Sequence, residues 1–208
     1  MRTLSSIPGG IVRRSVRYGH RIRTRLRRLS APRQLRQHDK LHLGCGPRHL
    51  GGWANVDVTG QGEIVWDLRR PLPVGGIRFV YSEHFVEHIE RDEAVRLLTN
   101  LRKVLRDDGV VRISTPDLAV IIDEYRAGIL ADMPEYDWQP SSLCRMVNDS
   151  MRLWGHRFIY DEDELRAVLA EAGFGRVERV AYNRSECPEL NNLESRPDLG
   201  DLIIEARI

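Results

Sequence analysis

Cysteine, lysine and long apolar runs are all scarce in this 208-residue sequence. The three cysteines, Cys45, Cys144 and Cys187, are far apart and form no C-x-x-C pair. Neither a disulfide framework nor a cysteine-based zinc site is therefore expected, and this usage favours a reducing, cytoplasmic location. No segment approaches the ~18 consecutive apolar residues of a membrane-spanning helix. Hydrophobic residues make up 41% of the chain, which is enough for one sizeable core.

Acidic residues are absent from residues 1–38, which contain 11 arginines. The whole chain has 32 basic and 30 acidic residues, so residues 39–208 carry an acidic excess. This difference divides the chain into a basic N-terminal arm (1–38) and a domain (39–208). On a helical wheel, the apolar side chains from Ile11 to Leu29 gather opposite most of the arginines. That pattern is typical of a helix lying on an anionic membrane surface.

The arm predicts that the protein binds peripherally, through residues 11–29, to the inner face of a membrane. Nucleic-acid phosphates are a less favoured partner. An organelle transit peptide, and an arm that is disordered or packs on the acidic domain, are further alternatives. Only Lys40 and Lys103 are lysines, so part of the arginine richness reflects a coding bias.

A short apolar run, residues 41–43, leads directly into Gly44-Cys45-Gly46. Glycine adopts positive φ readily and lets a ligand approach the backbone amides. The next apolar run ends at Asp57, whose carboxylate could accept hydrogen bonds from both hydroxyls of a ribose. The third glycine of the dinucleotide fingerprint is missing, with His49 in its place, and Asp57 comes early for that pattern. The spacing indicates a nucleoside-containing ligand without a pyrophosphate.

Strands and helices alternate along the rest of the domain. Apolar patterns predict strands at 63–68, 77–82 and 110–116 around a helix at 91–106. A helix at 117–125, an irregular lid at 128–142 and a helix capped by Asp161 and ending at Gly173 follow. Strands at 177–181 and 202–206 close the chain. This order predicts an α/β fold with a parallel sheet covered by helices.

These residues resemble the class I methyltransferases that use S-adenosylmethionine (AdoMet). The resemblance is carried by Leu43-Gly44-Cys45-Gly46, Asp57, Asp67-Leu68, the run from Ser82 to His88 and the helix that precedes Gly109. More narrowly, the segments 81–88, 112–118 and 194–197 resemble a bacterial group of small predicted methyltransferases. The resemblance covers about residues 39–208. It implies a Rossmann-like, parallel-dominated seven-stranded sheet with one antiparallel strand and helices on both faces.

The resemblance also implies a set of cofactor-binding residues. Asp57 would accept from the ribose, Asp67 from the adenine amino group, and Leu68 would cover the adenine ring. His42 stands where many relatives carry an acidic residue, so backbone carbonyls and the loop after 82 would hold the amino acid end of AdoMet. The complete set is Leu43, Gly44, Cys45, Gly46, Asp57, Asp67, Leu68, Ser82, Glu83 and His84.

Methyl transfer requires alignment of an acceptor and, for a hydroxyl, removal of a proton. His88 is the first candidate for that base, followed by His84 and His156. The expected acceptor is a small molecule or glycan, such as a sugar or cell-envelope precursor, bound by side chains between Trp138 and Tyr160. No metal is expected.

Two alternatives come from other classes. The first is a nucleoside-binding module without turnover that acts as a membrane-tethered partner. The second is a zinc peptidase, because His84 to His88 also spells H-x-x-E-H, with a third ligand at Glu162 or Glu164. A peptidase would explain neither the glycine turn nor Asp57.

Overall fold

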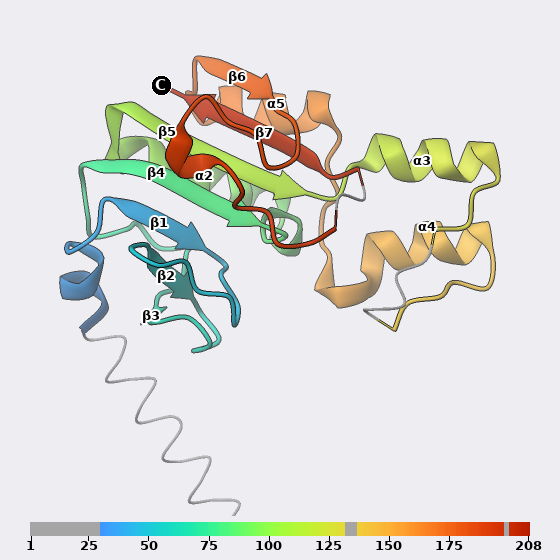
Figure 1. Ribbon diagram of the computed structural model, residues 1–208, viewed down its shortest axis with the longest axis horizontal. Coiled ribbons are helices and arrows are strands. Elements are labelled where there is room, and N and C mark those ends of the chain that lie inside the picture. Colours follow the sequence, from blue (N-terminus) through green and yellow to red (C-terminus); the bar gives the residue numbers. More distant parts are fainter. Residues whose placement is uncertain (1–29, 132–136, 198–199) are drawn as a thin grey trace, which may run out of the picture.

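Seven strands form a single mixed sheet in the computed structural model, which describes residues 30–131, 137–197 and 200–208 (Figure 1). The strand order is β3-β2-β1-β4-β5-β7-β6. β1 to β5 pair in parallel, whereas β7 runs antiparallel to both β5 and β6. The expected sheet with one antiparallel strand is therefore confirmed. The strands are β1 (Lys40–Leu43), β2 (Ala54–Asp57), β3 (Ile64–Val65), β4 (Ile77–Glu83), β5 (Leu105–Thr115), β6 (Arg176–Arg179) and β7 (Leu202–Arg207).

The helices α2 (Arg91–Val104) and α5 (Glu162–Glu171) pack against one face of the sheet. α2 begins with a capping box between Glu90 and Glu93. The prediction that this helix continues to residue 106 is wrong. It ends at Val104 because Leu105 takes an extended conformation and pairs with Ile77 in β4. The predicted cap of α5 is confirmed, since the Asp161 side chain accepts from the Glu164 amide.

Apolar side chains of alternate strand residues form two cores, one on each face of the sheet. Leu41, Leu43 and Val80 belong to the larger core, which α2 and α5 cover. Tyr81 and Phe79 point to the other face and pack with Leu190 of η4 (Pro188–Leu190). That face is therefore covered by the segment 183–197 between β6 and β7.

The described end of the N-terminal arm packs against the domain. Residues 30–35 are helical, and Ala31 and Leu35 are fully buried in the larger core. Arg36 donates a hydrogen bond to the Pro73 carbonyl. The amphipathic helix predicted between residues 11 and 29 lies outside the described residues. None of the helices within the described ranges has the length and apolar character needed to span a bilayer.

Two further helices, α3 (Leu118–Ala127) and α4 (Leu143–Arg152), project beyond the end of the sheet where β4 and β5 finish (Figure 1). They pack against each other, and the short helix η3 (Leu153–Gly155) returns the chain toward the sheet. The sequence predicted an irregular lid at 128–142 but not α4. The order of strands reverses between β1 and β4, and ligands of open α/β sheets bind outside the carboxyl ends of strands at such a point.

Candidate functional site

The glycine loop follows β1 at this reversal point. Gly44 has φ of +62°, and a Cβ built on it would lie 2.4 Å from Cγ of Phe85, which follows β4. A side chain at position 44 would therefore be strained and would clash with the neighbouring loop. The loop is held from the other side as well, because the Gly46 amide donates to Oδ2 of Asp57 at 3.1 Å.

Asp57 ends β2 beside this loop and is 9% exposed. Its Oδ1 atom accepts hydrogen bonds from the amide and the hydroxyl of Thr59, at 2.7 and 2.5 Å. Each carboxylate oxygen has two lone pairs. The hydrogen bonds from Gly46 and Thr59 therefore fix the orientation of the side chain and still leave it able to accept a further hydrogen bond. Asp57 is thus a pre-oriented acceptor at the end of a strand.

A cavity of about 400 Å³ opens beside the loop. We call it the glycine-loop cavity. Gly44, Asp57, Asp67 and Leu68 line it, together with side chains of α2 and the loop after β4. Asp67 is oriented by Arg69, whose Nε and Nη2 donate to its two carboxylate oxygens at 2.9 Å each. Four residues predicted to bind the cofactor therefore share one hollow.

His84 follows β4 and is held between two acids. Its Nε2 lies 2.8 Å from Oδ2 of Asp201, and its Nδ1 lies 3.3 Å from Oε1 of Glu87. Burial by itself lowers the pKa of this histidine, but the hydrogen bonds to Asp201 and Glu87 outweigh burial and raise the pKa to about 9. His84 is therefore an imidazolium at neutral pH and holds no free lone pair for a proton.

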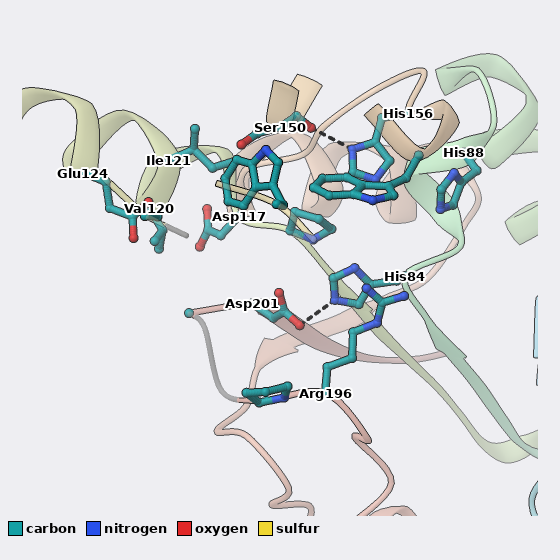
Figure 2. A pocket seen from close by; sticks show the side chains of 16 residues that line it. His84, His88, Asp117, Val120, Ile121, Glu124, Ser150, His156, Arg196 and Asp201 are labelled. Atoms are coloured by element: carbon teal, nitrogen blue, oxygen red, sulfur yellow. Dashed lines mark hydrogen bonds and ion pairs between the residues drawn. The ribbon is translucent and has the colours of Figure 1, made fainter. Parts of the chain in front are cut away.

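His156 has the opposite character. Its Nδ1 is 2.7 Å from the Ser150 carbonyl oxygen, so Nδ1 carries the proton and Nε2 keeps its lone pair. Burial lowers the pKa of His156, which stays neutral near pH 7. The rings of His88 and His156 are edge to face with centroids 5.0 Å apart. Figure 2 shows these histidines around one hollow, with His84 paired to Asp201 and His156 to Ser150.

This second hollow, the histidine cavity, has a volume of about 350 Å³. Its walls come from the loop after β4, the loop after β5, α3, the α4–η3 region and the segment before β7. Trp138 and Trp154 lie edge to face within it, with centroids 5.7 Å apart. Trp154 has φ of +57°, a conformation that side-chain-bearing residues adopt rarely and mostly at functional sites. Among the described residues, His88 alone lines both cavities.

No protein-family model matches the sequence, and neither does any curated protein. Solved structures of similar shape include a SAM dependent methyltransferase from Archaeoglobus fulgidus, at 18% identity over 91% of this chain and 94% of that one, with a TM-score of 0.49. A S-adenosylmethionine dependent methyltransferase from Mesorhizobium loti has 19% identity, coverages of 81% and 90%, and a TM-score of 0.47. The structure of PigF with SAH has 15% identity and a TM-score of 0.49. The match covers 83% of this chain but only about half (51%) of the length of PigF.

Likenesses this distant carry no argument about activity. The fold rests on the strand order and on the reversed, antiparallel β7 beside β5. The chain has a Rossmann-like α/β fold.

The remaining residues predicted to bind the cofactor lie outside the glycine-loop cavity. Burial raises the pKa of the Cys45 thiol to about 12, and the thiol donates to the Gly46 carbonyl. Burial would raise the pKa of Glu83, but hydrogen bonds from Ser195 and Arg196 bring it below its usual value. His84 lines the histidine cavity, and Leu43, Cys45, Gly46, Ser82 and Glu83 line neither. Their roles stay predictions.

His42 has no part in either cavity. Its side chain is buried on the face of the sheet opposite the larger core, where its Nδ1 lies 3.1 Å from Oδ1 of Asn55. Burial lowers the pKa of His42 to about 4, so the ring is neutral.

The three histidines predicted as bases all line the histidine cavity. Sequence reasoning missed Asp201, which is 117 positions from His84 and which no motif spacing could connect to it. It also missed Asp117, although this residue lies two positions after the end of β5 and the strand-end rule could have found it.

Proposed function

We propose that this chain is an AdoMet-dependent methyltransferase that acts on a small-molecule or glycan-type acceptor. The observation that carries the proposal is the meeting of two cavities at His88, outside the carboxyl ends of the parallel strands. A methyl transfer needs such a pair of adjoining sites, because donor and acceptor must lie in line with each other.

The glycine-loop cavity suits a nucleoside with an apolar ring and no phosphates. Asp57 is placed for ribose hydroxyls, and Leu68 and Trp66 supply apolar walls. The buried Nε1–H of Trp66 makes no hydrogen bond to the described part of the chain, so a bound ligand can accept it. Asp67 lines the same cavity, in reach of an adenine amino group under this proposal.

The histidine cavity suits an acceptor that has both apolar faces and hydroxyls. Trp138 and Trp154 offer aromatic surfaces, while Asp117, Glu124 and Asp201 offer carboxylate oxygens. Burial raises the pKa of Glu124, which favours its use as a hydrogen-bonding partner. Sugars present this combination of C–H faces and hydroxyl edges, which supports the glycan-type acceptor.

AdoMet, when bound, supplies a methyl group activated on a sulfonium. His88 is placed to contact the acceptor where the two cavities meet, with its side chain 31% exposed. The ring of His156 lies 5.0 Å from that of His88, centroid to centroid, and its Nε2 keeps a free lone pair. His84 serves as a fixed cation that orients Glu87 and Asp201. Proton removal therefore falls to His88 or His156, not to His84.

Calorimetric titration of the full chain with S-adenosylhomocysteine tests cofactor binding. We expect saturable binding, weakened about tenfold or more in Asp57→Asn, because the variant loses a charge-assisted acceptor for the ribose. Asp108→Asn is the matched control, since Asp108 is exposed and pairs only with Arg106 within the described chain. Absence of binding, or equal weakening in the control, overturns the proposal.

Turnover is tested by incubating the chain with methyl-labelled AdoMet and fractionated cell extract. Label transferred to a polar, glycan-containing fraction supports the proposed acceptor class. Binding without label in any fraction would instead establish the nucleoside-binding module that lacks turnover.

A further inference from the structure

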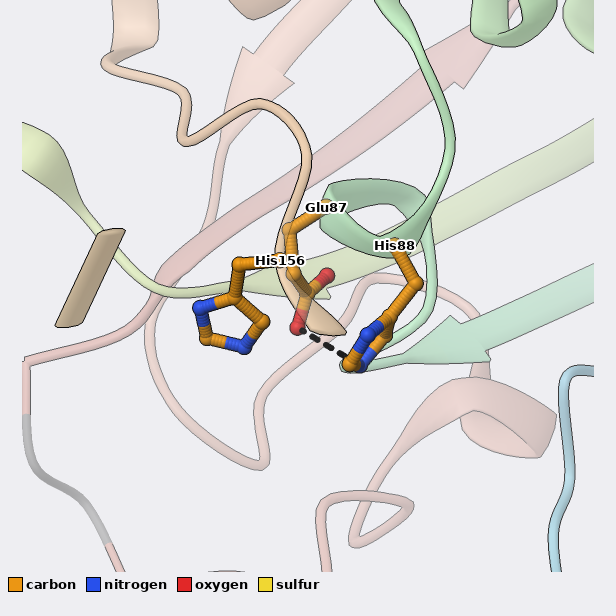
Figure 3. A group of neighbouring side chains, drawn as sticks. All are labelled: Glu87, His88 and His156. Atoms are coloured by element: carbon orange, nitrogen blue, oxygen red, sulfur yellow. Dashed lines mark ion pairs between the residues drawn. The ribbon is translucent and has the colours of Figure 1, made fainter. Parts of the chain in front are cut away.

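Glu87, His88 and His156 bring three metal-ligand side chains together (Figure 3). His88 lines both cavities, and His156 lines the histidine cavity. One possible ligand atom from each lies within 4.8 Å of the others. Across the described ranges this is the only such group of three. Two imidazoles and one carboxylate are a donor set that proteins use for divalent transition metals.

Two of the three side chains are held by hydrogen bonds in orientations that suit metal binding. His156 donates its Nδ1–H to the Ser150 carbonyl, which leaves Nε2 as a ligand and fixes the ring, as second-shell hydrogen bonds do in metal sites. Glu87 is fully buried in the folded chain. Thr115 donates to Oε2 of Glu87 at 3.0 Å and orients it.

His88 completes the set from the position next to Glu87 in the sequence. Its Nε2 lies 3.9 Å from Oε1 of Glu87, too long for a hydrogen bond. No other side chain in the described part of the chain bonds to this ring, so small rotations can bring it to an ion. His84, which the H-x-x-E-H motif would use, is instead committed to Asp201 and Glu87.

We propose that Glu87, His88 and His156 bind one divalent transition-metal ion, with zinc(II) as the expected species. Three protein ligands leave an open coordination position, as catalytic zinc sites do. Because His88 lines both cavities, an ion held there can take a hydroxyl oxygen of the acceptor in that position. Binding of the ion rests on this cluster alone, whereas its use in turnover rests on the proposed methyl transfer.

The ion changes how the acceptor would lose its proton. With their lone pairs on the metal, His88 and His156 no longer take the proton. The metal lowers the pKa of the coordinated hydroxyl instead, and the proton leaves to solvent water.

Cobalt(II) is the probe for the site. The full chain is stripped with a chelator and titrated with cobalt(II), followed by visible absorption, and zinc(II) is then used to displace it. We expect one ion per chain and a drop in affinity of about tenfold or more in His88→Ala and in His156→Ala. His38→Ala is the control, because His38 lines neither cavity.

Thr115→Val adds a test that does not remove a ligand. It should weaken cobalt(II) about tenfold, since orienting partners of metal ligands contribute on that scale. Thermal melting confirms that each variant is folded. Absence of stoichiometric cobalt(II), or unchanged affinity in both histidine variants, overturns the metal site.

The same preparations are titrated with S-adenosylhomocysteine without metal. Cobalt(II) binding with no affinity for that compound keeps the metal site and removes the proposed methyl transfer. The reverse result keeps methyl transfer and removes the metal.

Discussion

His84 and His156 of the candidate site differ in charge because their partners differ. His84 is a cation between Asp201 and Glu87, whereas His156 is neutral with its Nδ1–H on a carbonyl. His88 lies at the boundary of the cavities, with its side chain 31% exposed. The H-x-x-E-H motif alone cannot reveal the charge of His84, because its partner Asp201 comes from a distant segment.

The ion pairs of His84 should make stability depend on pH. Its pKa is raised from 6.5 to about 9 in the folded chain, so its contribution is fully present below pH 6.5 and disappears as pH rises through 9. The shift corresponds to roughly 3 kcal/mol of unfolding free energy. Urea denaturation at several pH values should show this loss in the wild type and not in His84→Gln. His38→Gln is the control, and a parallel slope in His84→Gln contradicts the prediction.

Gly44 is the residue whose substitution should cost most in the glycine loop. Gly44→Ala places a Cβ 2.4 Å from Cγ of Phe85 at φ of +62°. We expect a loss of about 2 to 4 kcal/mol in unfolding free energy from strain and overpacking. Thermal or urea denaturation measures it.

Gly75→Ala is the matched control for Gly44→Ala. Nothing lies within 4 Å of a Cβ built there, so its effect should be within about 0.5 kcal/mol. Adding Phe85→Ala to Gly44→Ala should recover the part of the lost unfolding free energy that is due to the clash. Equal stability losses at positions 44 and 75 would rule the clash out.

The segment between β6 and β7 is the element whose role only the fold reveals. Glu194, Ser195 and Arg196 belong to the narrower resemblance, but their sequence indicates no task. In the structure, Ser195 and Arg196 donate to Glu83 at the end of β4. Glu194 forms a bidentate pair with the fully buried Arg112 of β5, at 2.7 and 3.0 Å. The segment is thus anchored to the sheet just before Arg196 enters the wall of the histidine cavity.

Breaking this anchor should be costly. Glu194→Ala leaves Arg112 with Glu205 as its remaining carboxylate partner in the described chain, at 2.7 Å, and removes half of its charge compensation. We expect a loss of about 3 to 5 kcal/mol in urea denaturation. Glu186→Ala is the control, because that side chain is 74% exposed and its effect should be below about 0.5 kcal/mol. Comparable losses in the two variants would contradict the anchor.

At the scale of the whole molecule, the sheet sets where chemistry can occur. β1, β4 and β5 end at the same edge, which places the glycine loop, His84 and Asp117 close together although they are far apart in sequence. The α3–α4 extension then closes the histidine cavity beyond that edge (Figure 1). The glycine-loop cavity and the histidine cavity are therefore adjacent by topology.

The arm gives a prediction for the whole chain. Its arginines and apolar residues should bind the full chain to vesicles that contain anionic lipid, and less to neutral vesicles. Neutral replacements of Arg13, Arg14, Arg17 and Arg21 should reduce flotation on anionic vesicles. The same replacements made at Arg106 and Arg126, which are exposed on the domain, are the control. Equal flotation of all variants contradicts a membrane-facing arm.

The sequence by itself determined the α/β class, the positions of most strands along the chain, the glycine turn and the strand-end Asp57. These follow from local periodicity, glycine chemistry and short-range spacing, which the chain carries in contiguous residues. Tertiary structure decided the rest. The end of α2 depends on the pairing of Leu105 with β4, the charge of His84 depends on Asp201, and the task of Glu194 depends on Arg112. Each of these results from groups that meet only after folding, where burial strengthens electrostatic contacts and no spacing in the sequence records them.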